Sequence, residues 1–178
     1  MIVLSLALVG AISACGNKTD KTLTASTEGP YIDLGDLQYQ VQISRQLNPS
    51  DIEDAAYLKG VTDTLGTDNV WFAVFVNVSN SSDKTRTPAT TFEITDTQGN
   101  TYTPVSIDLK SNDYGYEPIP IPGKGVLPNP SSTAAQNSIN GRLLLFKIPV
   151  SSLDNRPLEL KIHNPDAPQQ VGTVNLDV

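Results

Sequence analysis

The sequence predicts an all-β fold, an antiparallel sandwich of two sheets with one short helix. Three observations support this prediction. Short apolar segments alternate with turn residues along the chain, 13 prolines and 12 glycines occur among 178 residues, and charged residues make up only 17%. The length suits one domain with a substantial core, and a hydrophobic content of 38% is that of a globular chain.

The most apolar internal segment is residues 70–78, Val-Trp-Phe-Ala-Val-Phe-Val-Asn-Val. Both of its alternating faces are apolar until Asn77, and a strand with two apolar faces must be covered on both sides. We therefore expect this segment in the middle of a sheet. Trp71 is expected in the core rather than on a sugar-binding surface, because it belongs to this buried strand.

The N-terminus has the features of a lipoprotein signal peptide. Residues 1–14 form an apolar run that is too short to span a bilayer but has the length of a secretory signal. The run ends in Ile12-Ser13-Ala14 before Cys15, which is the only cysteine. This ending resembles the bacterial lipobox, whose cysteine receives a diacylglyceryl group. No Lys or Arg precedes the run, which departs from the usual signal. The alternative interpretation is an uncleaved hydrophobic tail.

Lipidation of Cys15 would place the protein on the extracytoplasmic face of the cell membrane. Residues 15–36 are rich in Thr, Ser, Lys, Asp and Gly, a composition typical of a flexible tether. Two acyl chains would hold the protein there stably. Residues 31–34 mark either the end of this tether or a short first strand. The folded domain is expected over residues 37–178.

The domain begins with an alternating segment, in which Leu37, Tyr39, Val41 and Ile43 form one apolar face. This pattern predicts a half-buried strand. Ser50 and Glu53 then form a capping-box sequence, and Gly60 can end a helix, so we expect one short helix over residues 51–59. Its residues Ile52, Ala55, Ala56 and Leu58 are available for packing. Its acids lack the spacing of an EF-hand, so capping is the preferred interpretation.

After the central strand, Asn77-Val78-Ser79 and Asn80-Ser81-Ser82 match the glycosylation pattern. In a bacterial lipoprotein we interpret them as residues of a strand end and a turn. Residues 91–104 are expected to form a β-hairpin, because Asp96-Thr97-Gln98-Gly99 has the composition of a type I turn between two strand-like segments.

Residues 110–140 carry five prolines between positions 118 and 130, a density at which no regular element is expected. Tyr114, Tyr116, Ile119 and Ile121 are the candidate partner-binding residues. The prolines keep this segment extended and stiff, and tyrosines offer wide contact surfaces. The competing interpretation is that Ile119 and Ile121 seal an open sheet edge, with the prolines blocking strand addition.

Three further strands complete the chain. Residues 141–149 are strongly apolar, with Leu144, Phe146 and Ile148 on one face, and strands follow near residues 158–163 and 174–178. We expect Phe72 and Phe146 to meet across the sandwich. About seven strands with turn signals between them are typical of an immunoglobulin-like β-sandwich.

The order of these segments resembles a bacterial protein family. The residues that carry the resemblance are the strand over 70–77, Phe92 to Asp96 with Gly99 and Tyr102, Pro122-Gly123, Leu145 to Pro149, and Leu158 to Leu160. The family comprises secreted or lipid-anchored domains of unknown function with a telokin-like, immunoglobulin-like sandwich, related to a small secreted mycobacterial immunogenic protein. The resemblance covers residues 37–178 and implies fold and location. It implies no catalytic residues.

The composition argues against several classes of function. With 12 Lys and Arg against 19 Asp and Glu, the net charge of −7 argues against nucleic-acid binding. One histidine, His163, and one cysteine leave no soft-metal ligand set, so no metal and no cofactor are expected. We expect a non-enzymatic monomer that binds an unknown protein partner or ligand at the cell surface. The alternatives are a structural accessory subunit of an envelope complex and a hydrolase with paired carboxylates.

Overall fold

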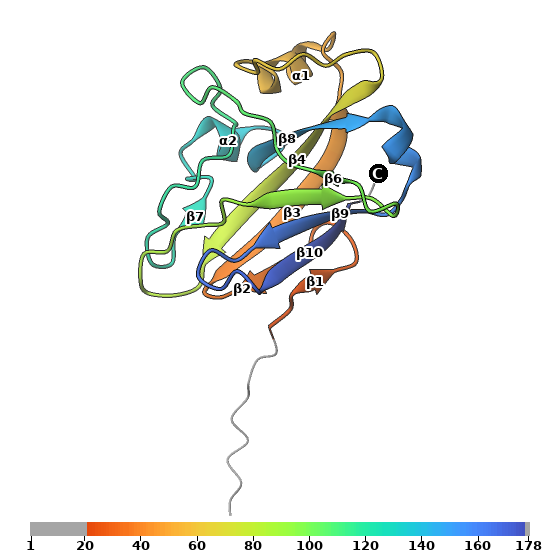
Figure 1. Ribbon diagram of the computed structural model, residues 1–178. Helices are drawn as coiled ribbons and strands as arrows, with labels where there is room; N and C mark the ends of the chain where they lie inside the picture. The colour runs from red at the N-terminus through yellow and green to blue at the C-terminus, as the bar shows by residue number, and fades with distance from the viewer. Residues whose placement is uncertain (1–20, 177–178) are drawn as a thin grey trace, which may run out of the picture.

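Two β-sheets pack face to face in the computed structural model, which describes residues 21–176 (Figure 1). The first sheet contains, in order across it, β1 (Thr24–Ala25), β10 (Val171–Leu176), β9 (Leu158–His163), β5 (Phe92–Thr95) and β6 (Thr101–Tyr102). The second contains β2 (Tyr31–Leu34), β3 (Leu37–Leu47), β4 (Asn69–Asn80) and β7 (Val126–Leu127), with β8 (Arg142–Pro149) also paired to β4. The predicted all-β sandwich is confirmed.

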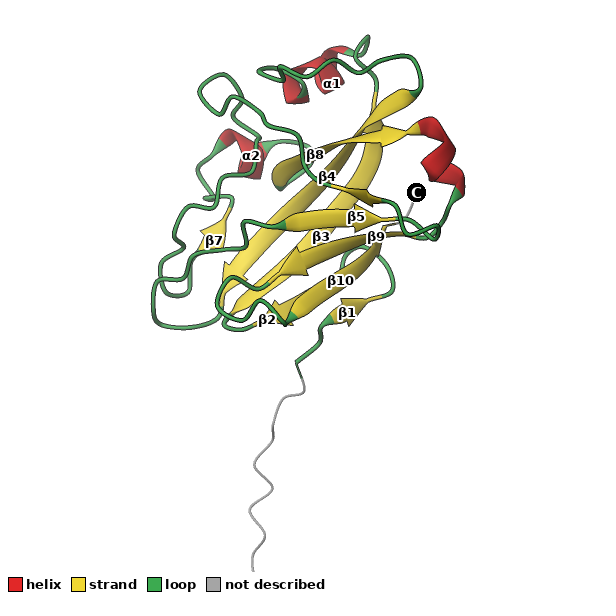
Figure 2. Ribbon diagram, viewed as in Figure 1, coloured by secondary structure: helices red, strands yellow, loops and turns green. Residues whose placement is uncertain are grey.

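The helical segments are short and lie at the periphery of the sheets (Figure 2). They are α1 (Ile52–Tyr57), α2 (Thr133–Gln136) and the 3-10 helix η1 (Val150–Asp154). All strand pairs are antiparallel except β1 with β10. The predicted hairpin over 91–104 is present as β5 and β6, with Ile94 opposite Tyr102.

β4 is the central strand, as predicted. It pairs with β3 along one side, and with β8 and then β7 along the other. Its inner face lies in the core between the two sheets, where Phe72, Val74, Val76 and Val78 are almost fully buried. Its outer face carries Trp71, Ala73 and Phe75 into a second apolar cluster, which we call the outer core. Both faces are therefore covered along this part of the strand.

The expectation that Phe72 and Phe146 meet across the sandwich is wrong. The two residues are directly opposite each other on neighbouring strands, β4 and β8, of the same sheet. Both are fully buried in the core between the sheets. The two most apolar internal segments of the chain are thus partners in one sheet, because each has two apolar faces and needs the same two covering layers.

The alternation of β3 changes midway. The strand pairs regularly with β4 up to Val41, and a β-bulge shifts the register between Val41 and Ile43. The bulge moves the side chains that follow onto opposite faces. Ile43, expected in the core, is therefore 37% exposed, whereas Ser44 is buried and its N–H donates to Glu28 Oε2 at 3.0 Å.

The helix differs from expectation in its cap and in its buried face. Asp51, not Ser50, is the N-cap, and its carboxylate accepts the N–H groups of Glu53 and Asp54. Ile52, expected to pack, is 88% exposed, whereas Tyr57 is buried. Asp54 is also buried because it pairs with the guanidinium of Arg45. Burial opposes ionisation of Asp54, but the bonds from Arg45 and Asn48 outweigh it and lower its pKa.

The folded domain begins earlier than residue 37. β2 pairs with β3 over the whole of residues 31–34, and β1 pairs with β10. The N–H of Asp33 donates to the carbonyl of Thr22 at 2.6 Å, and Lys21 Nζ donates to the carbonyl of Gly35 at 2.6 Å. The predicted tether over 15–36 therefore contains two strands, which its polar composition concealed because both lie at sheet edges.

The segment 110–140 holds more regular structure than its prolines suggested. It contains β7 and α2, and Ile121 forms an isolated bridge with Arg86. Both elements are short, at two and four residues. Neither element contains a proline, and both line the site described next.

Candidate functional site

The four candidate partner-binding residues do not form one surface. Tyr114 packs edge-to-face on Tyr57, with ring centroids 4.8 Å apart, and belongs to the outer core. Tyr116 packs on Phe92 on the other side of the segment, and its hydroxyl donates to the carbonyl of Ala89 at 2.8 Å. Burial raises the pKa of Tyr116 well above its usual value. Both rings are thus part of the protein's own packing.

The two isoleucines also diverge. Ile121 is buried at 2% exposure, whereas Ile119 is 42% exposed. Residues 114–116 hydrogen-bond to the free edge of β8: the Leu143 N–H donates to the carbonyl of Tyr114 at 2.8 Å, and the Tyr116 N–H donates to the carbonyl of Leu143 at 2.9 Å. The segment thus covers a sheet edge, but it does so through residues 114–116 and not through Ile119 and Ile121, to which the competing interpretation assigned this role.

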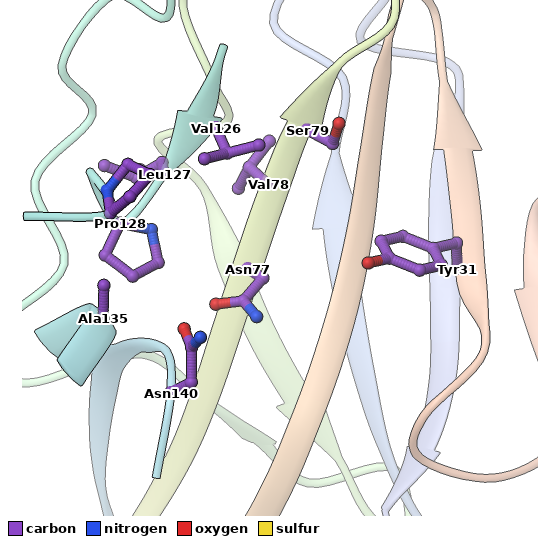
Figure 3. A pocket seen from close by; sticks show the side chains of 10 residues that line it. Tyr31, Asn77, Val78, Ser79, Val126, Leu127, Pro128, Ala135 and Asn140 are labelled. Atoms are coloured by element: carbon purple, nitrogen blue, oxygen red, sulfur yellow. The ribbon is translucent and has the colours of Figure 1, made fainter. Parts of the chain in front are cut away.

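A different cavity is the best candidate site. It has a volume of about 280 Å³ and lies between β4, β7 and α2, with Tyr31 of β2 at its side (Figure 3). Its polar lining consists of Tyr31, Asn77, Ser79 and Asn140, and its remaining lining residues are Val78, Val126, Leu127, Pro128, Pro130 and Ala135. We call it the amide pocket, because Asn77 and Asn140 point toward each other within it.

The pocket exists because β4 changes partner. Val76 of β4 is opposite Arg142 of β8, and Val78 is opposite Leu127 of β7. Asn77 lies at the position between the two partners. The chain from Pro128 to Gly141 leaves the sheet there, and a hollow remains beside β4.

Asn140 reaches the pocket through a close approach of two backbones. The N–H of Gly141 donates to the carbonyl of Ala134 at 3.0 Å, which ties the return of the chain to α2. A Cβ added at Gly141 would lie 3.1 Å from the Cβ of Phe75 and 3.2 Å from the nitrogen of Val76. A glycine therefore lets Asn140 sit directly beside β4.

The polar groups of the pocket have unused hydrogen-bonding capacity. Asn77 Oδ1 is buried and has no hydrogen-bond partner among the described residues. Within residues 21–176, no hydrogen bond involves the side chains of Tyr31, Ser79 or Asn140 either. No charged side chain is among the described residues that line the pocket. The site can therefore bind by neutral hydrogen bonds and apolar contact.

The pocket continues into a polar row on the outer face of the sheet. Tyr31 of β2 is opposite Gln40 of β3, which is opposite Asn77 of β4. Gln40 is already held in place, because its Nε2 donates to the carbonyl of Gly29 at 2.5 Å and its oxygen accepts from Gln42. The row therefore presents Tyr31 and Asn77 as the two members that are free to bind.

A second, polar cavity of about 390 Å³ lies around Arg142, near Asp113, Glu117 and Ser131 to Thr133. Arg142 Nη1 donates to the carbonyl of Asp113 at 2.9 Å, and its Nε is buried without a partner among the described residues. Burial lowers the pKa of this guanidinium, and the charges of Glu117 and Asp113 oppose that effect. The cation is therefore compensated by its own neighbours.

Other polar residues serve the fold. Asp96 closes the β5–β6 turn by accepting hydrogen bonds from Asn100, and these bonds lower the pKa of Asp96 to about 2. His163 lies on β9 with its Nε2 3.3 Å from Glu93 Oε1, away from the amide pocket. Residues 21–176 contain no group of three or more His, Cys, Asp or Glu that could hold a metal ion.

Sequence reasoning missed the amide pocket. Asn77 was interpreted as a strand-end residue, and Tyr31, Ser79 and Asn140 were not considered as a site. One signal was available, since Asn77 is the first polar residue in the most apolar segment of the chain. The other lining residues come together only through the partner change of β4. Cys15, the predicted lipidation site, lies outside the described residues.

Comparison with solved structures shows similarity in fold. The chain is similar to the crystal structure of a protein from Bacillus subtilis subsp. subtilis str. 168 described as a putative lipoprotein (ycdA), with a TM-score of 0.54 and 12% identity. The match covers 83% of this chain and 38% of the other, so the chain spans well under half of that protein's length. It is also similar to the yjhA protein from Bacillus subtilis, with a TM-score of 0.51, 8% identity, and coverage of 85% and 99%.

No protein-family model matches the sequence, and no curated protein matches it. The structural similarities are at low identity, so they bear on the fold alone. The relationship to the mycobacterial immunogenic protein therefore stays a prediction.

Proposed function

We propose that this chain is a lipid-anchored, extracytoplasmic binding protein whose amide pocket takes a small uncharged ligand, without catalysis. The observation that carries the proposal is Asn77 Oδ1, which is buried without a partner among the described residues, beside a cavity whose described lining is uncharged. An unsatisfied buried acceptor costs about 1–3 kcal/mol. A ligand that donates a hydrogen bond to this oxygen would remove that cost. The pocket also offers concave apolar walls, which are the usual setting for a few convergent polar groups.

The arrangement of the N-terminus supports anchoring. The described chain enters the sandwich beside β1, at the end opposite α1 (Figure 1). Residues 21–25 are fixed to the domain by the bonds of Lys21 and Thr22 and by the β1–β10 pair. Five residues lie between Cys15 and Lys21, and the six residue steps that join the two positions span at most about 20 Å. Lipidation at Cys15 would hold the β1 end close to the membrane surface.

Two further points concern location. No helix within residues 21–176 is long and apolar enough to cross a membrane. A structural neighbour described as a putative lipoprotein is consistent with the signal in residues 1–15. An anchor at Cys15 would thus be the means of membrane attachment in this proposal.

The hydrolase alternative rests on one observation, the presence of Asp113 and Glu117 in the polar cavity around Arg142. Both residues are exposed, and both act on the charge of Arg142. A glycosidase instead needs one protonated and one ionised carboxyl on either side of the substrate. Compensation of a half-buried guanidinium explains the two acids more simply. The role of accessory subunit would need a contiguous apolar patch. The large apolar side chains that are exposed among the described residues come from several elements and loops, and two of them, Tyr31 and Val126, line the amide pocket; the others are Ile43, Ile52, Leu109, Ile119 and Val150.

One experiment with the full-length protein, produced in bacteria and extracted in detergent, tests both parts of the proposal. Its first part is mass spectrometry of the native chain. We expect a mature chain that begins at Cys15 and carries acyl groups, and we expect Cys15→Ala to lose the lipid and the membrane association. A native chain without lipid, or one that begins elsewhere, would show that the anchor is wrong.

The second part measures binding of neutral and charged small molecules by saturation-transfer NMR. We expect neutral hydrogen-bonding compounds to bind, and Ala135→Trp to abolish binding by filling the pocket. Gln136→Trp is the matched control, because the neighbouring residue on α2 is exposed and does not line the pocket. Binding that survives in Ala135→Trp would place the site elsewhere.

A further inference from the structure

We propose that the ligand is a neutral sugar carrying an acetamido group, with that group held between Asn77 and Asn140. This inference rests on the proposed function and names its ligand class. Both asparagines line the amide pocket from different segments, one on β4 and one after α2, and their side chains face each other. The same pocket is also lined by apolar side chains, among them Leu127, Pro128 and Ala135.

A secondary amide matches this pair. Each asparagine side chain has one acceptor oxygen and a two-proton donor. A turn of the Asn77 amide toward the cavity would let the N–H of an acetamido group donate to Oδ1, which is buried and has no partner among the described residues. Its carbonyl can accept from the amide of Asn140, which makes no hydrogen bond within residues 21–176. A hydroxyl can also donate to one group and accept from the other, but both bonds then meet at a single oxygen atom and no apolar group is supplied to the pocket wall.

The apolar wall accounts for the methyl end of the acetamido group. Leu127, Pro128 and Ala135 line the same pocket. Leu127 and Pro128 are themselves buried, so their surfaces form a fixed wall rather than mobile side chains. A methyl group placed there loses contact with water and adds apolar burial to the two amide hydrogen bonds. A plain hydroxyl in the same position would leave this wall without an apolar partner.

The surface beside the pocket fits the rest of a saccharide. Tyr31 is 49% exposed and stands two strands from Asn77 in the row through Gln40. Neighbouring strands are about 4.8 Å apart, so the row extends roughly 10 Å from Asn77 to Tyr31, which lines the far side of the pocket. A Tyr ring offers an apolar face and a hydroxyl, which suits the mixed apolar and hydroxyl surface of a sugar ring. The row therefore has room for at least one ring beyond the acetamido group.

Charge and sheet geometry disfavour the other ligand classes. A charged ligand would lose water in a pocket whose described lining has no opposite charge. An extended peptide usually binds by adding a strand to an open edge. Here the edge of β4 is already paired with Arg142 on one side of Asn77 and with Leu127 on the other. The ligand class that remains is a neutral compound that binds against the face of the sheet.

The test compares two disaccharides that differ only in the group of interest. N,N′-diacetylchitobiose and cellobiose share their linkage and ring, but only the first has acetamido groups. We expect the full-length protein in detergent to bind diacetylchitobiose at least about tenfold more tightly by titration calorimetry, since it alone adds a buried methyl group to the two hydrogen bonds. Asn77→Ala and Asn140→Ala should each weaken that binding about tenfold or more, while leaving cellobiose binding nearly unchanged.

Controls separate loss of binding from loss of folding. Gln98→Ala, in the exposed turn after β5 on the other sheet, should bind like the wild type. Thermal unfolding of each variant should match that of the wild type. N-acetylalanine methylamide provides the peptide-like comparison, and it should bind more weakly than diacetylchitobiose because it lacks the ring that meets Tyr31.

Each outcome decides the inference. Equal binding of the two disaccharides, or tighter binding of the peptide-like amide, overturns the acetamido sugar. If other neutral compounds bind in the pocket and Ala135→Trp removes them while diacetylchitobiose does not bind, the proposed function stands and the sugar class is wrong. If no neutral compound binds in an Ala135-dependent way, both fail.

Discussion

The outer face of β4 has two halves with opposite character. Trp71, Ala73 and Phe75 form the first half and are buried in the outer core. Asn77 and Ser79 form the second half and face the amide pocket. The inner face of the same strand is buried along both halves, from Phe72 to Val78. The difference between the halves thus lies in what covers the outer face.

The covered half has a lid built from distant parts of the chain. Tyr57 at the end of α1 packs edge-to-face on Phe75 with centroids 4.9 Å apart, and Tyr114 packs in turn on Tyr57. Asn112 ties the lid together, because its Nδ2 donates to the carbonyls of Tyr57 and Lys59 at 2.9 and 2.7 Å. Among the described residues, no comparable aromatic layer covers the open half, and its polar groups keep unused hydrogen-bonding capacity. One strand therefore contributes to the outer core at one end and, in the proposed function, to a binding surface at the other.

The largest expected effect is in the covered half. Phe75 is fully buried, so Phe75→Ala should lower the free energy of unfolding by about 3–5 kcal/mol. Ser79→Ala, on the same face of the open half, should change it by no more than about 0.5 kcal/mol. Urea denaturation of both variants measures the contrast. Similar losses in the two variants would mean that the outer core does not carry stability.

The sequence predicted the covered half well. The uninterrupted apolar pattern of residues 70–76 required cover on both faces, and Trp71 was correctly assigned to the core. The position of β4 in the middle of its sheet followed from the same pattern. These features are local, since they depend on the period of the strand and the chemistry of its own side chains.

The open half could not be predicted in the same way. The pocket depends on the change of partner from β8 to β7, which involves residues far apart in the chain. The tyrosines of the proline-rich segment offered contact surface in sequence, but Tyr114 and Tyr116 found partners in Tyr57 and Phe92. The bulge in β3 and the edge strands before residue 37 were missed for a related reason: register and edge pairing depend on neighbouring strands.

A second asparagine on β4 extends the comparison, because Asn80 differs from Asn77 in hydrogen bonding. Asn80 is buried at 1% exposure, and its Nδ2 donates to the carbonyls of Lys84, Ile121 and Pro122 at 2.7, 3.0 and 2.9 Å. Its Oδ1 accepts from the N–H and the hydroxyl of Ser82. It thereby holds the proline-rich segment against the end of the strand.

Asn80→Ala should therefore lower the free energy of unfolding by about 2–3 kcal/mol, because buried carbonyls of the segment lose their donor. The loss should be smaller than that of Phe75→Ala. Hydrogen exchange should also increase at Ile121, whose N–H bonds to the carbonyl of Arg86 in the same region. Unchanged stability and exchange in this variant would show that the segment is held by other contacts.

Asn77→Ala is expected to have the smallest effect on stability, and it tests most directly the comparison between the covered and open halves of β4. The side-chain oxygen of Asn77 is buried without a partner among the described residues, so it contributes a desolvation cost and no compensating bond. Removing the amide should leave the free energy of unfolding within about 0.5 kcal/mol of wild type, or raise it slightly. The measurement is urea denaturation without ligand, beside Asn80→Ala under the same conditions. A loss as large as that of Asn80→Ala would mean that Asn77 has a structural role, and the case for a site kept open for a ligand would fall with it. A neutral effect on stability, together with loss of diacetylchitobiose binding, would show that this amide is retained for the ligand.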